Sequence, residues 1–387
     1  MPSFARVPGH RFTVAIFSIL AILGLLVIGA GWYYSSLLKS GGLEPDYSPD
    51  KLNMRVVAID GGLITLTAGD GGDVNDLKDD ELWGLEGENG YGQVKDILRV
   101  DGNEVTRVFQ PMTGEIHSGD AVRLDSFAFR GDPMAARGVS FRAVSIPSDL
   151  GDLPAWRVDG SDTWVIFVHG FGSDREEALR ILPTVSDLGL SSLVITYRND
   201  EEAPRSPDGL IRWGATEWQD LEAAVDYASG AGARSVILYG YSMGGGIVAA
   251  FLERSDRADI VAGAILDSPV LNFSALLSFQ ARQQHVPGII VSIGKQFAAR
   301  RFDLDWDEMN FMPELDLIHV PILLFHGDDD ERAPISTSEQ FAAQRPDIVT
   351  YVVGKTAGHV RNWNIGPAAY EETVRRFLVE RIQGVSP

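Results

Sequence analysis

Ser242 lies in a five-residue pattern that is typical of a serine nucleophile. Glycines stand two positions before and after it, in Gly240-Tyr241-Ser242-Met243-Gly244. The apolar run SVILY, a predicted strand, enters this pattern, and GIVAAFLERS, a predicted helix, leaves it. A tight strand-to-helix turn needs small neighbours and exposes the serine at a helix N-terminus, which favours developing negative charge. A Gly-rich turn without chemistry is the alternative, but the flanking strand and helix favour the nucleophile.

His359 is the predicted base for this serine. A general base is needed on a loop at the carboxyl edge of the sheet. His359 follows VTYVVG, a predicted strand, and precedes the last predicted helix. The chain has seven histidines. Each of the other six lies at the end of a predicted strand, just before one, or in another segment: His10, His117, His169, His285, His319 and His326. Elimination and chain order therefore both favour His359.

Three consecutive aspartates are candidates for the acid that orients this histidine. Asp328, Asp329 and Asp330 directly follow PILLFHG, a predicted buried strand. The chain order serine, aspartate, histidine fits each of them, so spacing alone leaves the choice open. A metal site formed by His326 and these carboxylates is an alternative. Because a complete triad already explains the segment, no metal ion is predicted.

Two backbone amides are expected to form an oxyanion hole. The amide of Met243, which follows the nucleophile, is one predicted donor. The other is the amide of Phe171, in a turn that follows the strand VIFV. Gly170 and Gly172 flank Phe171 and allow this turn to approach the serine closely.

These residues need a sheet that brings them to one edge. From about residue 140 the sequence alternates apolar runs with amphipathic segments, such as the predicted helix REEALRILPTVSDLG. The alternation predicts an α/β domain over residues 140–385, with a mostly parallel sheet and helices on both faces. Residues 270–315 form a long insertion, which we interpret as a partial helical cap. Its apolar residues either line an acyl pocket or pack the cap onto the body, and we favour packing: Phe273, Leu276, Leu277, Phe279, Ile289 and Ile290.

Together these motifs resemble the α/β-hydrolase superfamily over about two-thirds of the chain. His169-Gly170-Phe171-Gly172 and the pattern around Ser242 carry the resemblance. The acid loop, from His326-Gly327 to Pro334, resembles the prolyl-oligopeptidase-like and Bem46-like branches, and this resemblance selects Asp330 as the acid. It implies an α/β-hydrolase fold and a serine hydrolase without a cofactor. It implies no particular substrate, because the fold hosts many chemistries.

The N-terminal region predicts one membrane-spanning helix. Residues 12–34 carry no charge and would span about 34 Å as a helix, enough to cross the hydrocarbon core. Arg6 and Arg11 precede the segment and Lys39 follows it, which favours a cytoplasmic N-terminus and an extracytoplasmic catalytic domain. Residues 1–11 form a short tail and residues 35–50 a predicted linker. A signal peptide cleaved after Gly31 is the alternative.

Residues 51–135 predict a small β-rich domain. Short β-prone runs flank turns such as Gly61-Gly62, and we found no motif that assigns the domain a function. The net charge of −21 would repel phosphates, so no nucleic-acid partner is predicted. The absence of cysteine excludes a cysteine nucleophile and a thiolate metal site.

The sequence therefore predicts a membrane-anchored serine hydrolase that cleaves carboxylic ester or thioester bonds of a small or lipid-like acyl substrate. A serine peptidase of the prolyl-oligopeptidase-like type is one alternative. The β-rich domain, at about 80 residues, is too small for the propeller of those enzymes. A non-catalytic binding protein on a hydrolase scaffold is the other alternative, and the complete triad argues against it.

Overall fold

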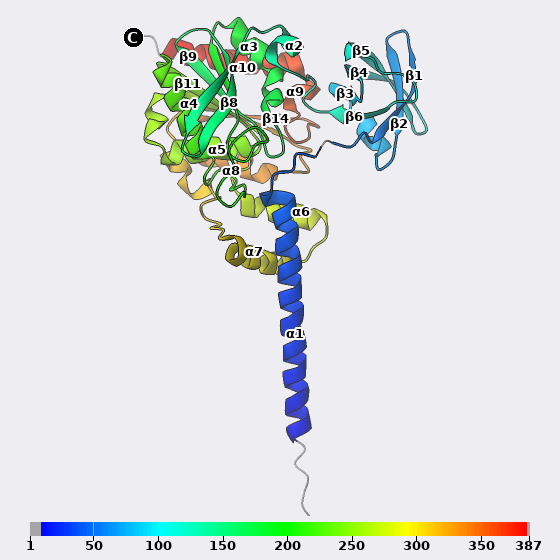
Figure 1. The fold of residues 1–387 in the computed structure, drawn as a ribbon, viewed down its shortest axis with the longest axis vertical. Helices are drawn as coiled ribbons and strands as arrows, with labels where there is room; N and C mark the ends of the chain where they lie inside the picture. The colour runs from blue at the N-terminus through cyan, green and yellow to red at the C-terminus, as the bar shows by residue number, and fades with distance from the viewer. Residues whose placement is uncertain (1–8, 49, 385–387) are drawn as a thin grey trace, which may run out of the picture.

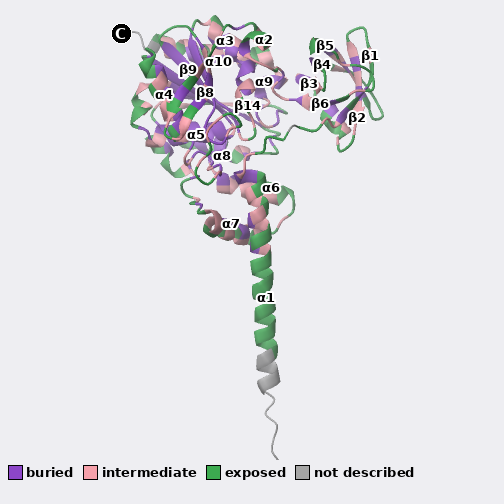
Figure 2. Ribbon diagram, viewed as in Figure 1, coloured by how far each residue is buried: buried purple, intermediate pink, exposed green. Residues whose placement is uncertain are grey.

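A single long helix projects from the body of the protein. The computed structural model describes residues 9–48 and 50–384, so most of the predicted tail, including Arg6, lies outside the described residues. Helix α1 (Gly9–Leu38) contains the predicted span, and a π-helical turn, η1 (Lys39–Leu43), continues it. The segment Ala15–Leu43 has a mean hydropathy of 2.4 and is long and apolar enough to cross a membrane. Figure 2 shows it exposed except where it meets α6 and α7.

The predicted linker over residues 35–50 begins too early. Helical structure continues through Leu43, and both Ser35 and Leu43 are fully buried. Ile211 donates its amide to the Leu43 carbonyl at 2.7 Å, so the end of the helix is docked on the body. The Gly, Pro and Ser residues of this segment predicted a linker. Composition indicates the local conformations that the residues prefer, but it carries no information about packing against distant segments.

The β-rich region forms a closed barrel of antiparallel strands in the order β1-β2-β5-β4-β3-β6. Gly61 and Gly62 form the predicted turn between the first two strands. Closure leaves no unpaired edge, and inward-facing side chains form a separate core. The elements are β1 (Met54–Asp60), β2 (Leu63–Ala68), η2 (Val74–Lys78), β3 (Trp83–Gly87), β4 (Gly90–Asp101), β5 (Glu104–Gly114) and β6 (Ala121–Asp125).

The barrel ends before the boundary predicted at residue 135. Ala128 and Val139 lie in the core of the larger domain, so the segment that follows β6 already packs there. Helix α2 (Pro133–Arg137) belongs to this connection. The predicted boundary followed a Gly-Asp-Pro turn signal, which marks a change of direction and not the core against which a segment packs.

An eight-stranded sheet forms the centre of the larger domain, in the order β14-β13-β12-β11-β9-β10-β8-β7. β8 pairs antiparallel with both β7 and β10, and the other pairs are parallel. The strands are β7 (Arg142–Ser148), β8 (Gly151–Val158), β9 (Thr163–Val168), β10 (Ser191–Ile195), β11 (Ser235–Tyr241), β12 (Val261–Asp267), β13 (Ile322–Gly327) and β14 (Val349–Gly354). β9 to β13 are almost wholly buried, which explains their continuous apolar runs.

Helices cover both faces of this sheet, as the sequence predicts. One core packs α4 (Trp218–Gly230), α5 (Met243–Arg254) and α8 (Ile335–Gln344) on one face. The other core packs α3 (Leu182–Asp187) and α10 (Pro367–Gly384), with α9 (Asn362–Ile365) and η3 (Arg175–Arg180) nearby. The single helix predicted over residues 175–189 is wrong, because it is divided into η3 and α3. Pro183 lies in the first turn of α3, where its missing N–H is tolerated but cannot continue a preceding helix.

The insertion after β12 forms helices beside α1. They are α6 (Phe273–Gln283), α7 (Gly288–Phe302) and η5 (Met312–Leu317). Figure 1 shows α6 and α7 where α1 meets the body. Phe273 and Leu276 are buried in the core, as we expected of residues that pack the insertion onto the body. Ile289 differs, since 68% of its surface is exposed.

Candidate active site

Ser242 occupies a strained turn between β11 and α5. Its φ of 50° and ψ of −115° are unusual for a residue with a side chain. The glycines on either side are required by space: a Cβ at Gly240 would lie 2.6 Å from the Gly244 carbonyl oxygen. A Cβ at Gly244 would lie 2.1 Å from the carbonyl oxygen of Val168. The turn therefore tolerates only glycine there, and it holds the serine above the edge of the sheet.

The structure brings Ser242, His359 and Asp330 together in a chain of hydrogen bonds. Ser242 Oγ lies 2.8 Å from His359 Nε2, and His359 Nδ1 lies 2.7 Å from Asp330 Oδ2. Asp330 is buried, whereas the serine and the histidine are partly exposed. Of its two neighbours, Asp328 is exposed and accepts a hydrogen bond from Lys355 at 3.0 Å. Asp329 is also exposed. The geometry thus separates Asp330 from its neighbours, which spacing alone did not.

A second histidine, His326, also contacts the Asp330 carboxylate. The His326 ring is fully buried, with Nε2 3.1 Å from Asp330 Oδ2 and Nδ1 2.8 Å from Ser338 Oγ. The amides of Arg332 and Ala333 donate to the other carboxylate oxygen at 2.9 and 2.8 Å. Burial alone would raise the pKa of Asp330, but the hydrogen bonds from His326 and His359 outweigh it and lower that pKa well below its usual range. The carboxylate is therefore held ionised in one orientation.

A role for His326 in positioning Asp330 was not predicted from the sequence, where His326 was set aside as the base and considered as a metal ligand. Within the described part of the chain, no group of three or more metal-ligating side chains is arranged to hold an ion. The signal for its positioning role is weak: a polar residue four positions before the acid, inside a strand that is otherwise apolar. Only the tertiary fold turns its ring toward Asp330.

The two predicted oxyanion donors flank the nucleophile. Phe171 lies in the turn after β9, and a Cβ at the preceding Gly170 would come within 3.1 Å of Ser242 Cβ. Met243 is the first residue of α5, so its amide is free of helical hydrogen bonds. Neither amide has a hydrogen-bond partner among residues 9–48 and 50–384. Both amides therefore keep an unused donor, and their role as an oxyanion hole stays a prediction.

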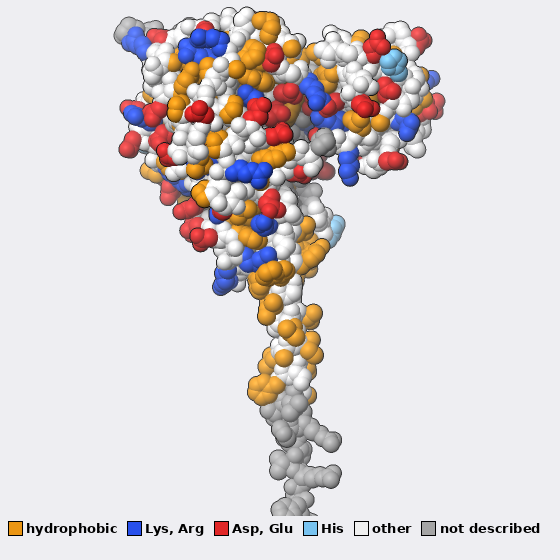
Figure 3. All heavy atoms as spheres, in the orientation of Figure 1, with side chains coloured by type: hydrophobic (Ala, Val, Ile, Leu, Met, Phe, Trp, Pro, Cys, Tyr) orange, Lys and Arg blue, Asp and Glu red, His pale blue; other side chains and the backbone are white. Residues whose placement is uncertain are grey.

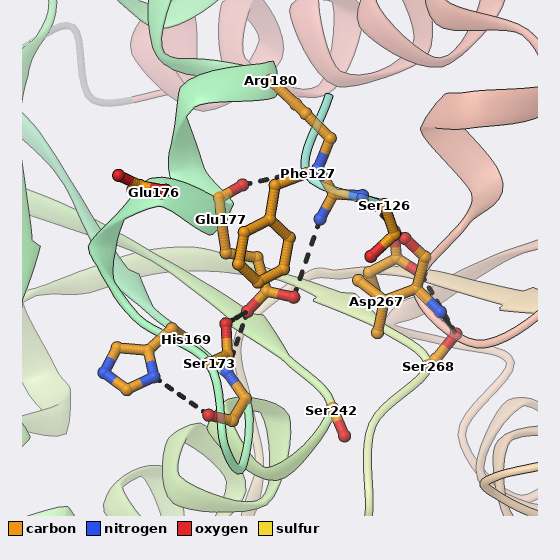
Figure 4. A network of polar contacts seen from close by, with 12 residues as sticks. Ser126, Phe127, His169, Ser173, Glu176, Glu177, Arg180, Ser242, Asp267 and Ser268 are labelled. Carbon is orange, nitrogen blue, oxygen red and sulfur yellow. Dashed lines mark hydrogen bonds and ion pairs between the residues drawn. The ribbon is translucent and has the colours of Figure 1, made fainter. Parts of the chain in front are cut away.

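A buried ion pair connects this turn to the loop that carries His359. Glu177 Oε2 accepts from the Gly170 amide at 2.9 Å and lies in the network of Figure 4. Arg180 lies 3.7 Å from Glu177 Oε1 and donates to the Val360 carbonyl at 2.8 Å. Burial raises the pKa of Glu177, while Arg180 opposes this rise. This pair was not predicted from the sequence, where its signal was a Glu and an Arg three positions apart in an amphipathic helical segment.

Polar groups at the end of β12 also bind the loop that carries His359. The Val360 amide donates to Ser268 Oγ at 3.1 Å, and Asn362 Nδ2 donates to Asp267 Oδ1 at 2.7 Å. The Tyr370 hydroxyl donates to the other Asp267 oxygen at 2.9 Å. Ser268 and Asp267 are drawn in Figure 4. The backbone next to His359 is therefore held by Arg180 of η3 and by Ser268, which follows β12.

His169, which begins the motif around Phe171, points away from the nucleophile in Figure 4. Its Nε2 lies 2.9 Å from Asp200 Oδ2, and its ring stacks on Tyr197. Burial opposes its protonation, but the Asp200 carboxylate prevails and raises the pKa of His169 to about 9. This histidine therefore supports the turn and does not enter the chain of hydrogen bonds at Ser242.

Comparisons with known proteins agree with this fold. The model of the alpha/beta hydrolase family matches residues 165–376. The uncharacterized protein YqkD of Bacillus subtilis is 25% identical over 245 residues, which cover 61% of this chain and 78% of that protein. The uncharacterized protein YfhR of Escherichia coli is 24% identical over 54% of this chain and 68% of that protein.

Among solved structures, the Pyrococcus furiosus esterase Pf2001 superposes with a TM-score of 0.53 at 20% identity. The superposition covers 65% of this chain and 95% of the esterase. A second structure of that esterase gives a TM-score of 0.51 at 21% identity, over 63% of this chain and 93% of that one. On the matched family model and this sheet, the chain belongs to the α/β hydrolase family.

Proposed function

We propose that this chain is a serine hydrolase that cleaves carboxylic ester or thioester bonds, with Ser242 as the nucleophile. The observation that carries the proposal is the continuous chain of hydrogen bonds from Ser242 through His359 to Asp330. A base within hydrogen-bond reach of the serine, and an acid that orients that base, are the parts that an acyl transfer requires.

In the proposed reaction Ser242 Oγ bonds to the acyl carbon while its proton moves to His359 Nε2. Asp330 stabilises the imidazolium that forms, and the amides of Phe171 and Met243 donate to the oxyanion. His359 then gives its proton to the leaving oxygen or sulfur as the bond to that atom breaks. Water attacks the acyl-enzyme, its proton passes through His359 to Ser242, and a carboxylic acid leaves.

We further propose that α1 anchors the enzyme in a membrane, with the N-terminus cytoplasmic and the catalytic domain outside. The length and apolar composition of α1 support an anchor, and the arginines before its uncharged segment, Arg6 and Arg11, support this orientation. An ester is favoured over a peptide because the six-stranded barrel is no propeller and because an anchored site lies beside lipid acyl groups. The resemblance to the Bem46-like branch fits the same reading.

Labelling with a fluorophosphonate tests the nucleophile. The full chain in detergent is the right sample, because a fragment that starts near residue 45 would lose Leu43, which is fully buried in the core. We expect wild type and Ser229→Ala to label, since Ser229 bonds only to its own helix. Ser242→Ala should not label. Labelling of Ser242→Ala would refute the proposed nucleophile, and faster cleavage of a peptide anilide than of p-nitrophenyl acetate would favour a peptidase.

A further inference from the structure

Helix α7 packs tightly across the last turns of α1. A Cβ at Gly31 of α1 would lie 2.3 Å from the Phe297 ring of α7, and one at Gly294 of α7 would lie 3.0 Å from Tyr34 Cβ. The two helices thus approach each other through small residues, one on each helix. Close approach of this kind fixes the position of α7 along α1.

Arg301 fixes the two helices at the level of Trp32. Its guanidinium carbon lies 3.7 Å from the centre of the Trp32 ring, and its Nη1 donates to the Trp32 carbonyl at 3.0 Å. The same nitrogen donates to Ser36 Oγ at 2.9 Å. Trp32 and Tyr33 end the uncharged segment and are mostly exposed. Aromatic residues at this place are typical of the boundary between hydrocarbon and headgroups, so α7 lies at that depth if α1 spans a membrane.

The first half of α7 carries an apolar face that is only partly covered. Ile289 and Ile293 lie four residues apart and so share a face, which we name the α7 apolar face. Ile289 is 68% exposed and Ile293 is partly exposed, whereas Phe297, the next residue at this spacing, packs on Gly31 of α1. Figure 3 shows hydrophobic side chains gathered where α1 leaves the body. Arg300, in the last turn of the helix, is exposed, whereas the neighbouring Arg301 is engaged with Trp32 and Ser36 of α1.

We propose that the α7 apolar face rests in the headgroup region of the membrane that α1 spans, so that the cap is seated on the bilayer. The inference rests on the proposed anchoring by α1. Lipid is the occupant that we propose, because Figure 3 shows hydrophobic side chains gathered where the exposed apolar surface of α1 meets the body. Exposed apolar side chains on a helix at the level of the interfacial aromatic residues suit burial at the boundary between headgroups and acyl chains.

This seating deepens the proposed function, because it places the cap between lipid and the site. Helix α6, which precedes α7, reaches the acid loop through two amides: Gln280 donates to the Arg332 carbonyl at 3.2 Å and Gln283 to the Glu331 carbonyl at 2.8 Å. These carbonyls directly follow Asp330. The substrate class that we propose on the basis of this seating is an acyl ester of a membrane amphiphile.

The chain has no cysteine, so a single introduced thiol can carry a fluorophore without further changes. Ile289→Cys tests α7. Leu25→Cys, 70% exposed on α1, tests the anchor, and Leu98→Cys, 56% exposed on the barrel, is the matched control. Each full-length variant is labelled with an environment-sensitive dye and reconstituted into phosphatidylcholine vesicles that carry nitroxide lipids. We expect headgroup nitroxides to quench the dye at position 289, deep nitroxides to quench it at position 25, and neither to quench it at position 98.

The outcomes separate the two proposals. Quenching at position 25 without quenching at position 289 would overturn the seating of α7 and leave the anchor standing. A dye at position 289 that is shielded from water but not quenched by lipid would also overturn it, since a protein surface, such as a second copy, would then cover α7. Absence of quenching at position 25 would overturn the anchor itself. Fluorophosphonate labelling of each variant reports on the serine independently of all three probes.

Discussion

At the scale of single residues, Asp330 differs from its neighbours in burial and hydrogen bonding. Three adjacent aspartates have the same chemistry, yet one is buried between two histidines and the others face solvent. Burial of a carboxylate is unfavourable unless hydrogen bonds compensate, and here two rings and two backbone amides supply them. Environment, and not residue type, therefore distinguishes Asp330 from its neighbours and supports the proposal that it is the acid.

Asp330→Asn should lower kcat for p-nitrophenyl acetate by about three to four orders of magnitude, because an amide cannot stabilise the imidazolium or select its tautomer. Asp329→Asn is the matched control, and it should leave kcat within about twofold because Asp329 is exposed. Steady-state kinetics of both variants check the expectation. A large loss of kcat in Asp329→Asn together with normal turnover in Asp330→Asn would show that Asp329 is the acid and would refute the proposed role of Asp330.

At the scale of elements, the barrel does more than separate the helix from the catalytic domain. The segment between η2 and β3 meets the loop after His359 through a pair of backbone and side-chain bonds. Leu82 donates its amide to the Asn364 carbonyl at 2.9 Å, and Asn364 Nδ2 returns a bond to the Leu82 carbonyl at 2.7 Å. Arg361 lies 3.1 Å from Asp79 and 3.3 Å from Glu81. The barrel domain therefore contacts and stabilises the segment that follows His359. The sequence of the barrel contains no motif from which this contact could be predicted.

Glu81 gives this interface a pH dependence. Burial raises the pKa of Glu81 to about 7, although Arg361 opposes the rise. The folded state then holds a proton that the unfolded state releases near pH 4.5, so stability falls as pH rises from about 4.5 to 7. Glu81→Gln should remove this loss and raise the free energy of unfolding at pH 8 by about 2 kcal/mol relative to wild type.

Denaturant unfolding at pH 5 and pH 8 measures this difference for the full chain in detergent. Glu88→Gln, at an exposed turn of the same barrel, is the control and should match wild type at both pH values. If Glu81→Gln were equally destabilising at both pH values, the carboxylate would be ionised in the folded state and the account of its burial would be wrong.

At the scale of the whole molecule, α1 and the catalytic domain are one structure. Trp213 Nε1 donates to the Gly42 carbonyl at 2.6 Å, and its ring stacks on Phe171 at 5.1 Å and on Phe273 at 4.3 Å. The end of the apolar helix is thus joined through one tryptophan to Phe171, the proposed oxyanion donor, and to α6. A simple tether would make no such contacts.

Leu43→Ala should destabilise the catalytic domain by about 2–4 kcal/mol, because Leu43 is fully buried and the truncation leaves a cavity. Leu37→Ala is the matched control, since 53% of Leu37 is exposed, and it should leave the unfolding midpoint nearly unchanged. Thermal unfolding of both full-length variants, followed by loss of fluorophosphonate labelling, compares them. Equal midpoints for Leu43→Ala and wild type would mean that η1 is only a tether.

The sequence by itself determined what local pattern can encode. The glycines around Ser242, the buried strands, the uncharged segment at residues 12–34 and the β-rich character of the next region all appear as contiguous signals. The structure keeps these elements, with errors at their ends: the linker begins later and the helix after β9 is divided by Pro183. Periodicity and composition report which residues prefer burial, and they do so within one element.

Only the tertiary structure decided which elements meet. Ser242 and His359 are 117 positions apart, and Arg180 and Val360 are 180 apart, yet both pairs are in hydrogen-bond contact. Residue spacing did not distinguish the three aspartates, and it did not indicate that His326 contacts Asp330. It also did not predict that α7 packs on α1. The physical reason is that a buried polar group must find its partner wherever the fold brings one, and a pattern in one segment carries no information about the distant segment that supplies it.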